Sequence, residues 1–111
     1  MAHLILFSKP QCTQCDTTKR ALHRKGLDVD SGDFTVIDVS EDVEAYNFVR
    51  SLGYLQVPVV VVTDGTYEEL IDTTHPAMVL ESWSGFRPDS INTMLEEYPE
   101  LGSILELEPI A

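Results

Sequence analysis

The fold is decided by the stretch Leu4-Ile5-Leu6-Phe7-Ser8-Lys9-Pro10-Gln11-Cys12-Thr13-Gln14-Cys15. Its first four residues are an apolar run of the kind that forms a short buried strand, and Ser8-Lys9-Pro10 ends that strand. A helix is predicted over residues 13 to about 25. We expect it to end at Gly26, because glycine suits the left-handed conformation just past a helix. The two cysteines therefore lie between a strand and the first turn of a helix.

Local signals frame a second predicted helix. Apolar residues recur at i, i+3, i+4 and i+7 over residues 45–52, which is the pattern of a helix with one buried face. We expect Ser40 to be its N-cap, with Glu41 and Asp42 in the first turn, where their charges complement the helix dipole. Gly53 is expected to end this helix.

The predicted strands lie at residues 4–7, 34–39, 59–63 and 78–83, and a last helix begins at Asp89. The order β-α-β-α-β-β-α predicts an α/β fold with a mixed four-stranded central sheet. Four consecutive valines in the third strand indicate that it is covered on both faces, which requires helices on both sides of the sheet. Because helices connect the first three strands, we expect these three to run parallel to one another.

Two segments have no element assigned. Residues 64–77 are long for a hairpin connection and are interpreted as an inserted or extended β-hairpin loop. Residues 99–111 form an acidic, leucine-rich C-terminal tail. Residues 1–98 are predicted to be one domain, because a chain of 111 residues leaves no room for a second core.

The charge of the chain argues against some classes of partner. Nineteen acidic and seven basic residues give a formal net charge of −12, so nucleic acid, which needs clustered basic residues, is not an expected partner. No apolar run approaches the ~18–20 residues of a membrane helix, and the N-terminus lacks the features of a secretory signal. We therefore expect a cytoplasmic monomer without membrane contact.

Positive charge is concentrated near the cysteines. Residues 1–26 contain five basic residues and one acidic residue, whereas the remainder contains two basic and eighteen acidic residues. The pairs Lys19-Arg20 and Arg24-Lys25 are either the solvated face of a helix or a docking surface for acidic partners, and the sequence favours neither interpretation.

A Cys-x-x-Cys pair at the start of a helix in a βαβ context is typical of redox proteins. The N-terminus of the helix favours the thiolate of Cys12; Lys9 and Lys19 would add to this effect, whereas Asp16 would oppose it. A thiol pKa lowered from ~8.5 to ~7 gives more thiolate at neutral pH at a moderate cost in nucleophilicity. We expect Cys12 to attack a partner's disulfide and Cys15 to resolve the mixed disulfide.

Two other uses of the cysteine pair fit the sequence less well. A structural zinc site needs four ligands, and the histidines at positions 3, 23 and 75 do not have the usual ligand spacing. A buried, unreactive pair is disfavoured by the polar Thr13-Gln14 insert and the basic flank. We therefore expect no bound metal.

Three stretches together resemble the NrdH-type redoxins, glutaredoxin-like proteins with the thioredoxin fold. They are Cys12-Thr13-Gln14-Cys15 with the following Thr18-Lys19-Arg20-Ala21, then Gly53-Tyr54-Leu55-Gln56-Val57-Pro58-Val59-Val60, and Trp83-Ser84-Gly85-Phe86-Arg87-Pro88-Asp89. The resemblance covers residues 4–98 apart from 64–77. The third stretch, at its distance after the proline, makes the resemblance specific.

The resemblance implies a carrier that reduces the large subunit of class Ib ribonucleotide reductase. Thioredoxin reductase would recharge it with electrons from NADPH, and no cofactor would be bound beyond the Cys12–Cys15 disulfide. Pro58 would be cis and face the disulfide, and Val57 would offer backbone groups to an extended partner segment. The alternative is a general glutaredoxin that uses glutathione, but the Gly-Gly and Asp motif of such proteins is absent at residues 83–89.

The residues at and around the redox pair form one predicted partner-binding site. We expect Trp83 and Phe86 to offer an aromatic surface and Arg87 an ion-pairing group, although Ser84-Gly85 and Pro88-Asp89 are also a plausible turn and helix start. The expected partner-binding residues are Lys9, Thr13, Gln14, Val57, Pro58, Trp83, Ser84, Gly85, Phe86, Arg87 and Asp89. The segments 64–77 and 99–111 depart from the family pattern, and the sequence does not indicate what they do.

Overall fold

The computed structural model describes residues 2–101. Its elements, in chain order, are β1 (His3–Ser8), α1 (Thr13–Arg24), β2 (Thr35–Asp38), α2 (Val43–Ser51), β3 (Val59–Thr63), α3 (Tyr67–Leu70), β4 (Val79–Ser84) and α4 (Pro88–Glu97). Each predicted helix and strand is present, and the structure adds the short α3. Among the described residues, no helix is both long enough and apolar enough to cross a membrane.

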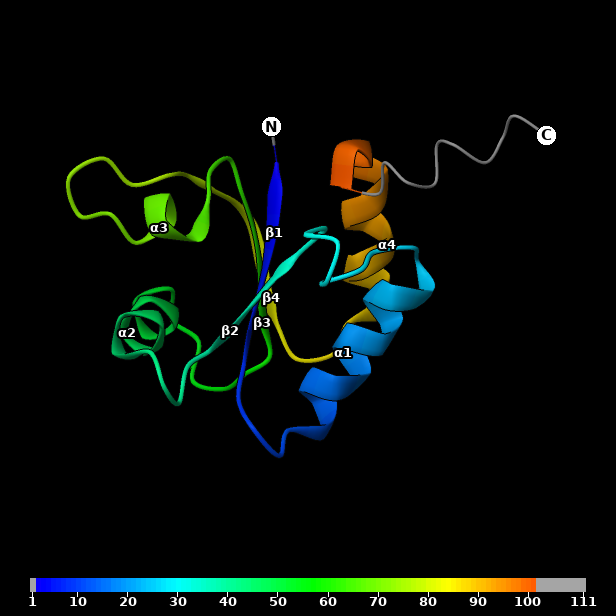
Figure 1. The fold of residues 1–111 in the computed structure, drawn as a ribbon, viewed down its shortest axis with the longest axis horizontal. Coiled ribbons are helices and arrows are strands. Elements are labelled where there is room, and N and C mark those ends of the chain that lie inside the picture. Colours follow the sequence, from blue (N-terminus) through cyan, green and yellow to red (C-terminus); the bar gives the residue numbers. More distant parts are fainter. Residues whose placement is uncertain (1, 102–111) are drawn as a thin grey trace.

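The four strands form one mixed sheet in the order β2-β1-β3-β4. Helices α1 and α4 cover one face of this sheet, and α2 and α3 cover the other (Figure 1). The valines of β3 serve both layers: Val60 and Val62 pack into the core under α1 and α4, whereas Val59 and Val61 pack into the core under α2. All four are fully buried, which confirms that this strand is covered on both faces.

The direction of β3 corrects one prediction. Strands β1 and β2 are parallel as expected, but β3 is antiparallel to β1. Helix α2 spans only about 13.5 Å at 1.5 Å per residue, and Figure 1 shows it nearly end-on, crossing the strands rather than running back along them. The chain therefore re-enters the sheet beside the C-terminal end of β1, where Val59 pairs with Phe7. From there β3 runs in the direction opposite to β1.

The start of α2 also differs from the prediction. Its N-cap is Asp42, whose Oδ1 accepts the N–H groups of Glu44 and Ala45 at 3.1 Å each. Ser40 lies before the helix, where its hydroxyl donates to Asp38 Oδ1. Asp42 is thus the cap rather than a first-turn residue, since only it lies one residue before the helix.

Glycines end α1 and α2 as predicted. Gly26 and Gly53 have φ values of 92° and 94°. At α1, the Leu27 N–H donates to the Leu22 carbonyl at 3.1 Å, and the Gly26 N–H donates to the His23 carbonyl at 3.0 Å. These two bonds satisfy carbonyl groups that the helix leaves without partners and so fix its last turn.

The segment 64–77 contains α3 and closes the connection between β3 and β4. Thr66 and Glu69 form a capping box: the Thr66 hydroxyl accepts the Glu69 N–H, and the Glu69 carboxylate accepts the Thr66 N–H. The spacing Thr-x-x-Glu is a local signal that could have predicted this helix. Of the predicted tail, Leu101 is buried in the core beside α4, whereas residues 102–111 lie outside the described residues.

Candidate active site

The two cysteines lie where the chain turns from β1 into α1. Cys12 is the N-cap of α1, and its Sγ accepts the backbone N–H of Cys15 at 3.2 Å. Gln11, before it, has a φ of 56°, which turns the chain sharply toward the helix. Inside α1, the Thr18 hydroxyl donates to the Gln14 carbonyl and is fully buried, so the first turn is fixed against the sheet.

Cys12 and Cys15 form a disulfide with their Cα atoms 5.2 Å apart. Cys12 remains 8% exposed, whereas Cys15 is fully buried. An approaching protein can therefore reach only the sulfur of Cys12. The Cys15 N–H points at that sulfur, and the same donor stabilises negative charge on Cys12 when the pair is reduced.

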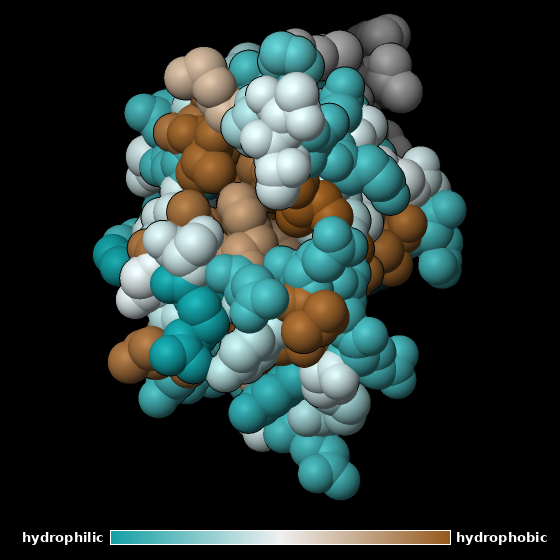
Figure 2. Space-filling view, turned by 90° about the vertical axis from the view of Figure 1, so that its left-hand side faces the viewer, coloured by the Kyte–Doolittle hydropathy of each residue, from teal (hydrophilic) through white to brown (hydrophobic). Residues whose placement is uncertain are grey.

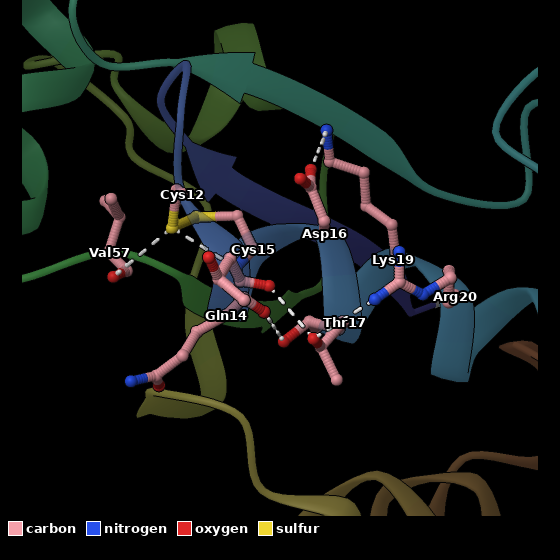
Figure 3. Close-up of polar contacts among 10 residues, drawn as sticks. Cys12, Gln14, Cys15, Asp16, Thr17, Lys19, Arg20 and Val57 are labelled. Carbon is pink, nitrogen blue, oxygen red and sulfur yellow. Dashed lines mark hydrogen bonds and ion pairs between the residues drawn. A yellow bond between two sulfur atoms is a disulfide. The ribbon is translucent and has the colours of Figure 1, made fainter.

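Figure 3 shows that Lys19 does not reach the cysteines. Its ammonium group lies 3.9 Å from Asp16 Oδ1, on the outer side of α1. Lys19 was expected to favour the Cys12 thiolate and Asp16 to disfavour it, but these two side chains form an ion pair with each other. Lys9 is exposed and lies in the surface groove described below.

The Val57-Pro58 peptide bond is cis, as predicted. The carbonyl oxygen of Val57 lies 4.0 Å from Cys12 Sγ, so the segment before β3 passes directly beside the disulfide (Figure 3). No backbone hydrogen bond among residues 2–101 uses the Val57 N–H. This backbone is therefore available to an extended segment from another chain.

Strand β4 holds that backbone in place. The Ser84 hydroxyl donates to the Gln56 carbonyl at 3.0 Å, and the Gly85 N–H donates to the Pro58 carbonyl at 2.8 Å. The hydroxyls of Tyr54 and Ser82 are 2.9 Å apart. Ser84 and Gly85, expected to contact a partner, are thus positioned to orient the Val57-Pro58 segment.

Gln14 connects the cysteine turn to the segment after β4. Its Oε1 accepts the N–H of Phe86 at 3.1 Å, and Figure 3 shows its side chain pointing away from the disulfide. Gly85 has a φ of 84°, and a Cβ there would come within 3.4 Å of the same Oε1. The 85–86 turn and the cysteine turn are therefore held together by one side chain.

The expectation of an exposed aromatic pair is wrong for Trp83. Trp83 is 5% exposed and belongs to the core under α1 and α4, while Phe86 is half-buried against that core. Arg87 is exposed and pairs with Asp89 across 3.5 Å at the start of α4. Within this stretch Arg87, Pro88 and Asp89 are exposed, and Phe86 is partly exposed.

A groove of about 420 Å³ opens beside Cys12. The predicted residues Lys9, Thr13, Gln14 and Val57 line it. Sequence reasoning missed Tyr46 and Arg50 from α2 and Leu55 from the segment before Val57. The available signal was the spacing of Tyr46 and Arg50 by one helical turn, each directly after a residue of the buried face of α2.

Within residues 2–101, no group of three or more His, Cys, Asp or Glu side chains is arranged to hold a metal ion. Four side chains away from the cysteines, Asp42, Tyr67, Glu81 and Tyr98, have displaced pKa values, and burial is the main cause that raises the pKa of Tyr98. The Tyr67 hydroxyl, which donates to Asp42 Oδ2 at 2.8 Å, is the main cause that lowers the pKa of Asp42. Burial, followed by the Asp42 carboxylate, raises the pKa of Tyr67. Burial and the neighbouring Glu97 raise the pKa of Glu81.

Comparison with known proteins places this geometry in a family. The family model of glutaredoxin matches residues 4–67, which is more than half of the chain. The chain belongs to the glutaredoxin family. This glutaredoxin-family chain is 34% identical over 91 residues to the glutaredoxin-like protein NrdH of Escherichia coli K12, covering 82% of this chain and 86% of that protein.

Solved structures of related proteins have the same fold as this chain. The NrdH-redoxin of Escherichia coli, a glutaredoxin-like protein described as having a thioredoxin-like activity profile, superposes with a TM-score of 0.61 and 33% identity. The match covers 83% of this chain and 93% of that one. Thioredoxin of Trichomonas vaginalis has a TM-score of 0.59 at 15% identity over 87% and 78% of the two chains, which shows the fold alone.

These findings confirm the thioredoxin fold and the resemblance to NrdH-type redoxins. Together with the Cys12–Cys15 disulfide, they identify this member of the glutaredoxin family as a thiol–disulfide oxidoreductase.

Proposed function

We propose that this protein is a dithiol electron carrier that reduces the active-site disulfide of class Ib ribonucleotide reductase. The observation that carries the proposal is the disulfide itself: Cys12 is partly accessible beside a groove, Cys15 is fully buried, and the Val57 carbonyl oxygen lies 4.0 Å from Cys12 Sγ. The similarity to NrdH proteins supports the choice of reductase partner. Such a carrier would work as a monomer in the cytoplasm.

The reaction is two thiol–disulfide exchanges. The Cys12 thiolate attacks one sulfur of the partner's disulfide; a mixed disulfide forms, and the other partner sulfur leaves as a thiolate and takes up a proton. Cys15 then loses its proton and attacks Cys12 Sγ, which breaks the mixed disulfide. The second partner thiol is released after protonation, so two electrons and two protons have passed to the partner.

The surrounding residues would orient the partner. An extended partner segment would pair with the Val57 backbone, which Ser84 and Gly85 hold beside Cys12. Phe86, Arg87 and Asp89 would contact the partner next to this segment, on the side joined to the cysteine turn by Gln14.

We propose thioredoxin reductase as the source of electrons, with NADPH consumed by that enzyme. The thioredoxin-like activity profile of the Escherichia coli relative supports this over glutathione. The alternative, a glutathione-dependent general glutaredoxin, is favoured only by the family match, and the chain lacks the Gly-Gly and Asp motif that would hold glutathione.

The test is dithiol-dependent ribonucleotide reduction by a purified class Ib enzyme. NADPH is supplied through thioredoxin reductase in one arm and through glutathione with its reductase in the other. We expect product only in the first arm, and none with Cys12→Ser. Product only in the glutathione arm would refute the proposed electron source, and no product in either arm would refute the proposed partner.

A further inference from the structure

The groove beside Cys12 differs in charge from the rest of the molecule. Its lining contains Lys9 and Arg50 and no aspartate or glutamate, although the chain has 19 acidic residues and a net charge of −12. The ion pairs of the described residues lie elsewhere, on α1 and at the start of α4. Neither cation of the groove is paired with a carboxylate within residues 2–101.

Arg50 is held in place without being neutralised. Its Nη1 donates to the Tyr46 hydroxyl at 2.8 Å, and its Cζ lies 5.7 Å from the centre of the Tyr46 ring. A guanidinium group has five N–H donors, so most remain free for a ligand. The planar group matches a carboxylate in shape as well as charge. Arg50 is therefore a preorganised site for a carboxylate.

Apolar and backbone groups border the same groove. Leu55 is 78% exposed, the most exposed large apolar side chain among the described residues. Two residues later, the Val57 carbonyl oxygen lies 4.0 Å from Cys12 Sγ, and no backbone hydrogen bond among residues 2–101 uses the Val57 N–H. Figure 2, which views the molecule from the α2 and α3 side, shows apolar patches separated by polar residues. A ligand that fills this groove would be extended, partly apolar and anionic.

We propose that the groove selects disulfide-bearing protein segments with an acidic residue next to the disulfide, whose carboxylate binds Arg50 with support from Lys9. This inference rests on the proposed function, since it names the kind of segment that the carrier reduces. The occupant is an extended polypeptide rather than glutathione, because Leu55 and the Val57 backbone offer contacts to side chain and main chain along its length.

Selection of this kind also answers an electrostatic problem. A carrier with a net charge of −12 repels an acidic partner at long range. At contact, the groove presents two cations and no anion. An acidic residue of the partner is therefore attracted if it lies in the groove, whereas acidic residues elsewhere on the partner face a negatively charged surface. The local charge thus sets which segment reaches Cys12.

The test compares two short peptides, each with one intramolecular disulfide. They differ only in that the residues flanking the disulfide are glutamate in one and glutamine in the other. Prereduced protein is mixed with excess peptide, the reaction is quenched with acid, and alkylated thiols are counted by mass spectrometry. We expect the glutamate peptide to react about three- to fivefold faster, the range of a well-placed exposed ion pair.

The variants isolate Arg50. Arg50→Gln should bring the ratio of the two rates to about one, and Arg50→Glu should reverse the preference, since this pair now repels. Arg50→Lys should keep part of the preference for the glutamate peptide. Arg20→Gln is the matched control, because it removes the same charge from α1 outside the groove and should preserve the ratio. Any effect of Arg50 on the reactivity of the Cys12 thiolate changes the rates with both peptides equally, so it cancels in the ratio of the two rates.

Failure of this inference can be told from failure of the proposed function. A ratio near one in the unaltered protein, or an equal loss in Arg20→Gln, overturns the acidic-segment proposal even if ribonucleotide reduction is intact. If Arg50→Gln instead slows reduction by glutathione and leaves the peptide ratio unchanged, the groove serves glutathione and the proposal is overturned. Absence of ribonucleotide reduction by the unaltered protein refutes the proposed function alone.

Discussion

Replacing Cys15 by serine should trap the mixed disulfide between Cys12 and a partner. The structure gives the two sulfurs different tasks: Cys12 is 8% exposed and Cys15 is fully buried. In Cys15→Ser, attack by Cys12 is preserved, whereas the group that completes the exchange is missing. The smaller oxygen of serine fits the buried position, so the fold should be retained.

The lifetime of the adduct can be estimated from the geometry. Cys15 is close enough to Cys12 to bond to it with no change in the helix, and well-oriented intramolecular groups act at effective concentrations of about 10⁵ M or more. Even if imperfect alignment lowers this about a thousandfold, Cys15 acts at ~100 M, against ~1 mM for an external thiol. The adduct of Cys15→Ser should therefore persist about 10⁵ times longer than that of the unaltered protein.

The assay is non-reducing electrophoresis after mixing each variant with an oxidised protein disulfide and quenching with acid. Cys15→Ser should give a covalent band that disappears with dithiothreitol. Cys12→Ser, which keeps only the buried thiol, should give little or none. A stronger adduct with Cys12→Ser than with Cys15→Ser, or no adduct with either, would contradict the assignment of attacking and resolving thiols.

The remaining predictions concern charged groups around the site and the two cores. Asp42→Asn should make unfolding in guanidinium chloride less dependent on pH on the acid side: the Tyr67 hydroxyl and helix N–H groups lower the pKa of Asp42, so its contribution is complete above about pH 4 and is lost as the pH falls through the native pKa. Glu81→Gln should raise the Tm at pH 7 and have no effect below about pH 4, because burial and Glu97 raise the pKa of Glu81 and make its ionisation destabilising. Arg87→Ala should slow NADPH oxidation coupled through thioredoxin reductase about two- to fivefold and leave reduction of a small aromatic disulfide unchanged, and equal losses in both assays would show a structural effect instead.

Much of the fold could be predicted because its signals are local. The start of α1 at the cysteines and its end at Gly26 depend on residues within one helical turn. The alternation of buried valines in β3 follows from the sequence itself, since neighbouring side chains in a strand point to opposite faces. The capping box of Thr66 and Glu69 is an equally local signal, which the interpretation of 64–77 as a loop overlooks.

The errors depend on contacts between distant segments. Ser40 and Asp42 are both good N-caps, and Asp42 also receives the hydroxyl of Tyr67 from α3, 25 residues away. The direction of β3 depends on how α2 crosses the sheet, which periodicity does not reveal. At the site, the cysteine pair was identifiable, but Arg50 reaches the groove only because α2 and the start of α1 meet there in three dimensions.

The burial of Trp83 has a practical consequence. It is the single tryptophan of the chain, and it lies in the layer between the sheet and α4. Its fluorescence is therefore an intrinsic optical probe of that layer, and its emission should shift to longer wavelength when water enters during denaturation. The stability measurements above can be followed on the unlabelled protein, with both cysteines left available for chemistry.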